Sequence, residues 1–143
     1  MADKRKFRIL VVDDESNVCE CVRLILSIDG YEVVTANSGH AALEKFAAYR
    51  FDVVCTDYSM PGMNGSQLAD ALRAIDPQQP ILMISGLAGT MTPPANVDIM
   101  LSKPFLPSEL KQSIAHLLNT GSQARPGPAS SAPLTCVVNE VLQ

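Results

Sequence analysis

Short apolar runs alternate with longer segments of helical periodicity along most of this chain, and this alternation is the feature that most constrains the fold. Strands that alternate with helices form a parallel sheet covered by helices on both faces. The sequence therefore predicts an α/β fold with a doubly wound, five-stranded parallel sheet. The strands that we expect are Arg8–Val12, Glu32–Ala36, Asp52–Thr56, Ile81–Ser85 and Ile99–Leu101.

Four helices are predicted from apolar residues that recur at helical spacing. The first is expected to stop at Gly30 and the second to start at Ser38. The third covers about Ser66 to Ile75, and the last covers about Pro107 to Leu118, with proline in its first turn. The inward face of the first helix is expected to consist of Val18, Cys21, Val22, Ile25 and Leu26.

The connection between the fourth and fifth strands, Gly86 to Asp98, is unfavourable for a helix. Pro93 and Pro94 remove two amide donors, and they disfavour helical dihedrals at Thr92. The pieces on either side of the proline pair are too short to form stable helices by themselves. We therefore expect a helix here that is missing or shortened to about one turn.

The 143 residues have room for one domain with a single core. From Gly121 the composition changes to "GSQARPGPASSAP", which is typical of a flexible linker. We expect a globular domain at residues 1–119, a linker with an apolar segment at residues 120–143, and no effector domain. In "LTCVVNEVLQ", Leu134, Val138, Val141 and Leu142 would share one helical face, and both a frayed end and a docking segment remain open.

The composition excludes several classes of protein. A formal net charge of -4 argues against direct nucleic-acid binding, because phosphate neutralisation needs a basic face. No apolar run approaches the ~20 residues of a membrane span, and no secretory signal is visible, so a cytoplasmic location is expected. The four cysteines form no disulfide framework, and His40 and His116 lack the spacing of zinc ligands.

Acidic residues follow two of the predicted strands. Asp13 and Asp14 end the first strand, and Asp57 ends the third. If these strands are neighbours, the carboxylates converge and repel one another unless a proton or a cation, most naturally Mg²⁺, intervenes. Ser85 ends the fourth strand and Lys103 comes just after the fifth, so both point to the same edge. Acids at strand ends also occur as helix N-caps, but five suitable groups at one edge favour a shared site for phosphoryl chemistry.

The stretch "VVCTDYSMPGMNG" delivers Asp57 from an apolar strand into a turn, as a carboxylate nucleophile that forms an acyl phosphate requires. The turn would direct the main-chain oxygen of Ser59 towards the metal. Pro61 fixes its own φ, and Gly62 and Gly65 are expected to adopt dihedrals that a side chain resists.

The stretches "ILVVDDE", "VVCTDYSMPGMNG", "ILMISG" and "SKPF" occur in order, and together they resemble the motifs of the response-regulator receiver family. The resemblance covers about Phe7 to Leu118. It implies a flavodoxin-like (βα)5 fold with the strand order 2-1-3-4-5. It also implies that Asp57 is the phosphoacceptor and that Ser85 is the switch hydroxyl, while Lys103 binds phosphate. The expected metal ligands are Asp13, Asp14, Asp57 and the main-chain oxygen of Ser59.

The resemblance implies that the protein is a stand-alone receiver, which takes a phosphoryl group from a histidine kinase or a histidine phosphotransfer protein. The reaction would need Mg²⁺, with Mn²⁺ as a substitute, and the domain would assist its own phosphorylation and dephosphorylation without being an enzyme. Its output would be contact with an unidentified downstream protein or phosphorelay, and we expect a monomer or weak dimer.

Two alternatives were weighed against this interpretation. A phosphatase of the haloacid-dehalogenase type expects a D-x-D pattern and a cap, whereas "VVDDESN" has adjacent acids. A receiver-like scaffold that is never phosphorylated would be signalled by loss of Asp57 or Lys103, and both are present.

Two departures from the family pattern concern output. Met100 stands where receivers usually have an aromatic residue, and the segment Gly86 to Asp98 stands where they generally have a fourth helix.

Overall fold

The structure, a computed structural model, describes residues 6–86 and 94–124, with side chains up to residue 120. Strands and helices alternate as the sequence predicted. The elements are β1 (Arg8–Val12), α1 (Ser16–Ile28), β2 (Glu32–Ala36), α2 (Gly39–Ala48), β3 (Val53–Asp57), α3 (Gly65–Ile75), β4 (Ile81–Ser85), β5 (Ile99–Ser102) and α4 (Pro107–Ala124).

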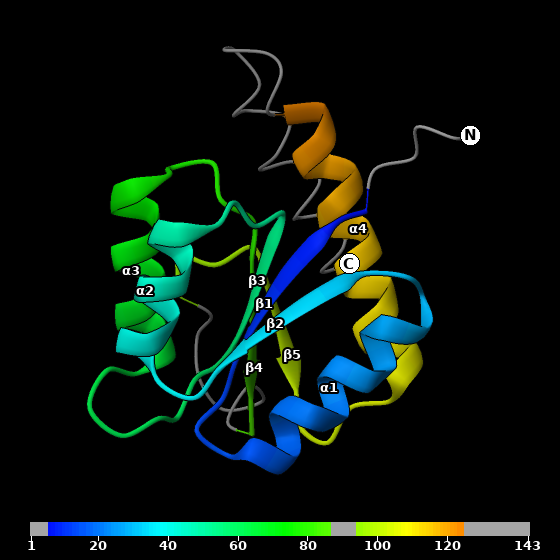
Figure 1. The fold of residues 1–143 in the computed structure, drawn as a ribbon, viewed down its shortest axis with the longest axis horizontal. Coiled ribbons are helices and arrows are strands. Elements are labelled where there is room, and N and C mark those ends of the chain that lie inside the picture. The colour runs from blue at the N-terminus through cyan, green and yellow to red at the C-terminus, as the bar shows by residue number, and fades with distance from the viewer. Residues whose placement is uncertain (1–5, 87–93, 125–143) are drawn as a thin grey trace.

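All five strands are parallel and lie in the order β2-β1-β3-β4-β5 (Figure 1). This arrangement confirms the predicted fold class and strand order. Because β1 and β3 are neighbours, the carboxyl ends of these two strands meet at the same edge of the sheet, at the bottom of Figure 1.

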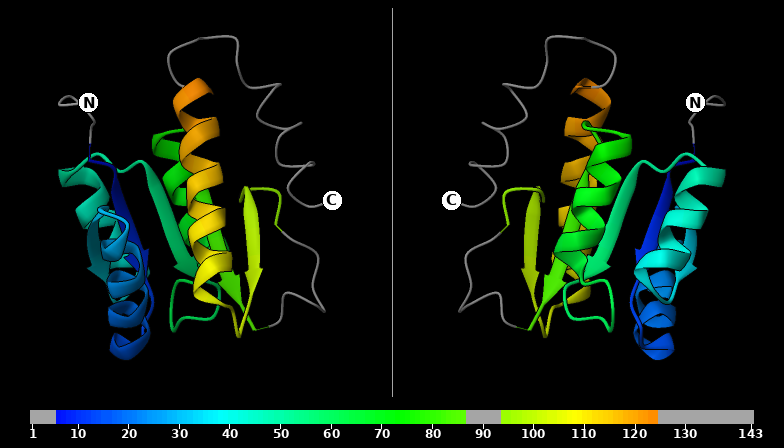
Figure 2. Two further views of the ribbon diagram at one scale, coloured as in Figure 1. Left: turned by 90° about the vertical axis from the view of Figure 1, so that its right-hand side faces the viewer. Right: turned by 90° about the vertical axis from the view of Figure 1, so that its left-hand side faces the viewer.

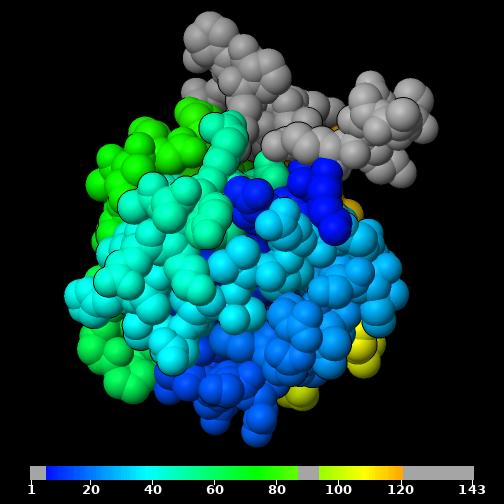
Figure 3. All heavy atoms as spheres, viewed as in Figure 1, coloured from blue at the N-terminus to red at the C-terminus, as the bar shows by residue number. Residues whose placement is uncertain are grey.

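Helices cover both faces of the sheet, with α1 and α4 on one face and α2 and α3 on the other (Figure 2). Figure 3 views the molecule from the β2 edge, where α1 and α2 flank the strand. Each face has its own apolar core because side chains alternate between the two faces along every strand. The largest fully buried side chains are Phe51, Ile9, Leu10, Leu26, Leu68, Leu72, Ile81, Leu82, Met83, Leu110, Ile114 and Leu117.

The inward face of α1 differs by one position from the prediction. Cys21 is exposed, and Cys19 is buried in its place together with Val22 and Leu26. The stripe predicted from Val18 to Leu26 was therefore wrong at Cys21, because the inward face of the helix is centred closer to Cys19. Cys19, Cys21 and Cys55 are free thiols, and of these Cys19 and Cys55 are buried.

The last helix is longer than predicted. It begins at Pro107 as expected but continues to Ala124, so the end at Leu118 was wrong. Of the connection between β4 and β5, residues 94–98 contain a turn closed by a hydrogen bond from the Val97 amide to the Pro94 carbonyl. The prediction of a missing or shortened helix falls mainly on residues 87–93, which lie outside the described residues.

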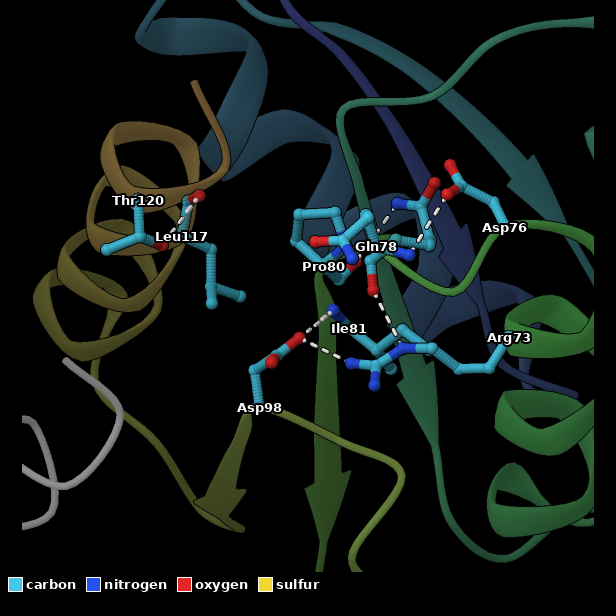
Figure 4. A network of polar contacts seen from close by, with 9 residues as sticks. Arg73, Asp76, Gln78, Pro80, Ile81, Asp98, Leu117 and Thr120 are labelled. Carbon is cyan, nitrogen blue, oxygen red and sulfur yellow. Dashed lines mark hydrogen bonds and ion pairs between the residues drawn. The ribbon is translucent and has the colours of Figure 1, made fainter. Parts of the chain in front are cut away.

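A polar network at the amino end of β4 fixes α3 against the sheet (Figure 4). The Asp98 carboxylate accepts hydrogen bonds from the Arg73 guanidinium and the Ile81 amide, each at 2.8 Å. Arg73 also donates to the Gln79 carbonyl at 3.0 Å. The network lies at the opposite edge of the sheet from the acidic residues and has a structural role.

Candidate functional site

Three carboxylates lie together at the carboxyl edge of the sheet. Asp13 and Asp14 follow β1, Asp57 is the last residue of β3, and one oxygen of each lies within 4.8 Å of the others. Asp13 and Asp57 are buried, whereas Asp14 is exposed. A cluster of this kind has two carboxylates held by the sheet and one open to solvent, and it needs positive charge to offset the repulsion.

Lys103 supplies positive charge to this cluster from the end of β5. Its Nζ lies 2.6 Å from Asp57 Oδ1 and 3.8 Å from Asp13 Oδ2. The side chain of Lys103 is half-buried, and its amide donates to the Ser85 carbonyl at 3.0 Å, which ties it to the end of β4. The peptide bond from Lys103 to Pro104 is cis. The lysine is therefore positioned to contact an anion held at Asp57.

Burial and charge shift the ionisation of the cluster. Burial raises the pKa of Asp13 from 3.8 to about 6, and the negative charges of Asp57 and Asp14 act in the same direction. The Glu15 amide, which donates to Asp13 Oδ1 at 2.9 Å, and the Lys103 charge both oppose this rise. Burial lowers the pKa of Lys103, but the hydrogen bond to Asp57 and the two nearby carboxylates outweigh it and raise the pKa overall.

The turn after β3 brings the chain back against Asp57. Gly62 has a φ of 78°, as predicted for a glycine that adopts dihedrals unfavourable for other residues. Gly65 needs its missing side chain for a different reason, since a Cβ there would lie 2.5 Å from the Asp57 carbonyl oxygen. The prediction of special dihedrals at Gly65 was therefore wrong, because this residue begins α3 and the constraint is one of space.

The two serines occupy different environments. Ser85 is buried at the end of β4, one position beyond Ile84, which pairs with Asp57 in the sheet. Ser59 is exposed, two residues beyond Asp57 in the turn. Met100 is half-buried on β5, between Ile99 and Leu101, which pack with α4, so its own side chain lies on the opposite face of the sheet.

The sequence missed the groups that hold Asp13 in place. The Asp13 amide donates to the Ala36 carbonyl of β2 at 3.1 Å, and the Cys19 thiol donates to the Asp13 carbonyl at 3.3 Å. The signal for Cys19 was its position five residues after Asp14, on the first turns of α1. It was overlooked because Cys21 had been assigned to the inward face.

The donor set fits a hard divalent cation. Carboxylate oxygens are the ligands that Mg²⁺ prefers, and the exposed Asp14 leaves one side of the cluster open to water and to a ligand. Among the described residues this cluster contains no histidine or thiolate, which zinc or a softer metal would favour.

Comparisons with known proteins agree with this geometry. A family model described as response regulator receiver domain matches residues 9–115. The transcriptional regulatory protein PrrA of Mycobacterium tuberculosis is 36% identical over 118 residues, which cover 78% of this chain and 49% of PrrA. The DNA-binding response regulator MtrA of the same species is 34% identical over 112 residues, covering 76% of this chain and 49% of MtrA. The chain thus spans about half the length of these curated relatives.

Solved structures show the same fold. The response regulator TrrA of Thermotoga maritima, in complex with Mg²⁺ and BeF, superposes with a TM-score of 0.72 at 34% identity, over 78% of this chain and 99% of that one. The chemotaxis protein CheY4 of Vibrio cholerae gives a TM-score of 0.72 at 33% identity, over 80% of this chain and 100% of that one.

Within residues 6–86 and 94–124, no helix is both long and apolar enough to span a membrane.

Proposed function

The chain belongs to the response-regulator receiver family of two-component signalling, and we propose that it accepts a phosphoryl group on Asp57 in a Mg²⁺-dependent reaction. The observation that carries this proposal is the position of Lys103 Nζ, 2.6 Å from Asp57 Oδ1 inside a cluster of three carboxylates. A carboxylate nucleophile, an acidic metal-binding set and a lysine for the phosphoryl oxygens are the groups that phosphoryl transfer needs.

In the proposed reaction, a carboxylate oxygen of Asp57 forms a bond to phosphorus while the bond from phosphorus to the donor breaks. The donor is a phosphohistidine of a kinase or a phosphotransfer protein, and its imidazole nitrogen is the leaving group. A bound Mg²⁺, or Mn²⁺ in its place, would supply positive charge for the phosphoryl oxygens. Asp13, Asp14, Asp57 and the main-chain oxygen of Ser59 would hold the metal.

Lys103 and Ser85 take up the transferred group in this proposal. The Lys103 ammonium exchanges its contact with the Asp57 carboxylate for one with a phosphoryl oxygen, and this keeps its charge paired. The Ser85 hydroxyl follows the phosphoryl group and so changes the surface near the end of β4. The domain assists its own phosphorylation and dephosphorylation, and it acts by signalling rather than by turnover of a substrate.

The biological setting is also part of the proposal. We place the receiver at residues 1–119 and a linker with an apolar segment at residues 120–143, although α4 itself continues to Ala124. The output is contact with a downstream protein or phosphorelay in the cytoplasm, by a monomer or weak dimer that does not bind nucleic acid directly.

Phosphorylation by acetyl phosphate tests the assignment. Intact-mass measurement is expected to show one added phosphoryl group when Mg²⁺ is present and none when the metal is chelated. Asp57→Ala removes the nucleophile and is expected to abolish the mass increase, whereas Asp70→Asn, at an exposed acid on α3, is the matched control that keeps it. Equal labelling of Asp57→Ala and the wild type would refute the assignment.

A further inference from the structure

A groove between β5 and α4 lies outside the acidic site. It has a volume of about 430 Å³. Ile99, Met100 and Leu101 line it from β5, and Glu109, Ser113 and His116 line it from α4. β5 is the last strand of the sheet and pairs only with β4 among the described residues. Figure 2 shows β5 at the outer edge of the sheet beside α4. The groove is thus bordered by apolar side chains and by an open strand edge.

His116, which lines the groove, carries a polar atom without a partner. The Nε2 of His116 is shielded from solvent and has no hydrogen-bond partner in the described part of the chain. Buried polar atoms are almost always paired, because an unpaired one loses the hydrogen bonds that it makes with water. An occupant of the groove would lie beside this histidine.

The chain carries a segment whose sequence suits such a groove. Residues 134–142 place Leu134, Val138 and Val141 on one face of a helix, with Thr135 and Asn139 on its polar side. An isolated segment of this length does not form a stable helix in water. Its helix would therefore form only when the apolar face is buried against another surface.

The length of chain between α4 and this segment matches the distance to the groove. The groove lies between Glu109 and His116, about 12 to 22 Å back along the helix axis from Ala124 at about 1.5 Å per residue. Residues 125–133 can span about 15 Å as a coil of Gly and Ser type, and up to about 28 Å as an extended proline-rich spacer. The segment can therefore reach the groove without strain.

We propose that residues 134–142 dock as a short amphipathic helix into the groove between β5 and α4 of the same chain. The short tether gives the segment an effective concentration in the millimolar range, so a weak intrinsic affinity suffices to fill the groove. A second copy of the chain lacks this advantage at micromolar concentration.

Nuclear Overhauser effects between methyl groups test the proposal in the 143-residue chain. We expect contacts between the Val138 methyls and the Leu101 methyls, which lie on the face of β5 that packs with α4, and we expect them not to change with protein concentration. Val138→Asp places a charge on the apolar face and is expected to abolish these contacts and to shift the Leu101 methyl signals. Asn139→Asp adds the same charge on the polar side and is expected to leave the Leu101 signals in place.

Two outcomes would overturn the proposal. Contacts seen only between differently labelled chains in a mixed sample would assign the groove to a second copy. Absence of contacts, together with unchanged Leu101 signals in Val138→Asp, would show that the segment does not dock there. Neither outcome would affect the phosphorylation of Asp57, so this proposal and the proposed function fail separately.

Discussion

Gly65 shows how closely the backbone near Asp57 is constrained at the scale of single residues. Its amide donates to the Tyr58 carbonyl at 2.8 Å, and an added Cβ would meet the Asp57 carbonyl oxygen at 2.5 Å and the Tyr58 Cα at 2.9 Å. Backbone atoms cannot move aside as a flexible side chain can. A substitution at Gly65 must therefore displace the end of β3 or the start of α3.

We predict that Gly65→Ala lowers the free energy of unfolding by about 1–3 kcal/mol, as overpacking of a tight site does. It is also expected to slow phosphorylation by acetyl phosphate, since the displaced backbone carries Asp57. Urea unfolding and intact-mass kinetics measure the two effects. Gly86→Ala is the matched control, because no atom lies within 4 Å of a Cβ there and its φ is not positive. Equal stability of both variants would contradict the steric explanation.

At the scale of elements, the network around Asp98 joins α3 to the start of β4 and to the residue before β5. Asn96 adds to this connection, because its Nδ2 donates to the Ser66 carbonyl at 2.9 Å and to the Asp70 carboxylate at 2.6 Å. Residues 96–98 are thereby held to the first turns of α3 and to β4. The network fixes the amino ends of β4 and β5, and the carboxyl ends of the same strands carry Ser85 and Lys103.

The network makes stability depend on pH in a predictable direction. Burial raises the pKa of Asp98 above 3.8, although Arg73 and the Ile81 amide act against this rise. The folded state therefore binds this proton more tightly than the unfolded state does. The resulting stabilisation is complete below the unfolded pKa of about 3.8 and is lost as the pH rises through the higher folded value.

Asp98→Asn removes this titration while its side-chain oxygen can still accept from the Ile81 amide. We predict that the stability of the wild type relative to Asp98→Asn decreases as the pH rises from acid to neutral. Urea unfolding of both proteins across this range measures the difference. If the stability of the wild type relative to Asp98→Asn instead increased with pH, the charge of Arg73 would affect the pKa of Asp98 more than burial does.

The sequence predicted the elements well where periodicity and stop signals agree, as at Arg8–Val12 and Ile81–Ser85. It failed where tertiary contacts decide. Cys19 and Cys21 lie only two positions apart on α1, so periodicity alone did not settle which one faces the sheet. The end of α4 was missed because Gly121 and Ser122 favour a stop, yet the helix continues through them.

The same distinction holds at the candidate site. Asp13, Asp14, Asp57 and Lys103 could be placed together because carboxyl ends of parallel strands share one edge. The amide of Glu15 and the thiol of Cys19 could not be placed, because hydrogen bonds to Asp13 depend on local geometry that strand order does not define.

At the scale of the whole molecule, repulsion among the carboxylates of Asp13, Asp14 and Asp57 lowers the free energy of unfolding. The same cluster provides a site for a cation. Asp13 and Asp57 are buried, and only Lys103 offsets them among the described residues that form ion pairs with them. A ligand that binds the folded state alone raises its stability by RT ln(1 + [L]/Kd), about 2.7 kcal/mol at a hundredfold excess over Kd. Mg²⁺ should therefore stabilise the entire domain.

We predict that Mg²⁺ raises the melting temperature of the wild type and that Asp14→Asn greatly reduces this rise. Because Asp14 is exposed, the variant should differ from the wild type by no more than about 0.5 kcal/mol without metal. Glu44→Gln, which neutralises an exposed acid on α2, is the control and should keep the full response to Mg²⁺. Differential scanning calorimetry with and without Mg²⁺ measures all three proteins. If Asp14→Asn and Glu44→Gln responded alike, the metal would be held without Asp14, and the cation would have to lie deeper between the two buried carboxylates.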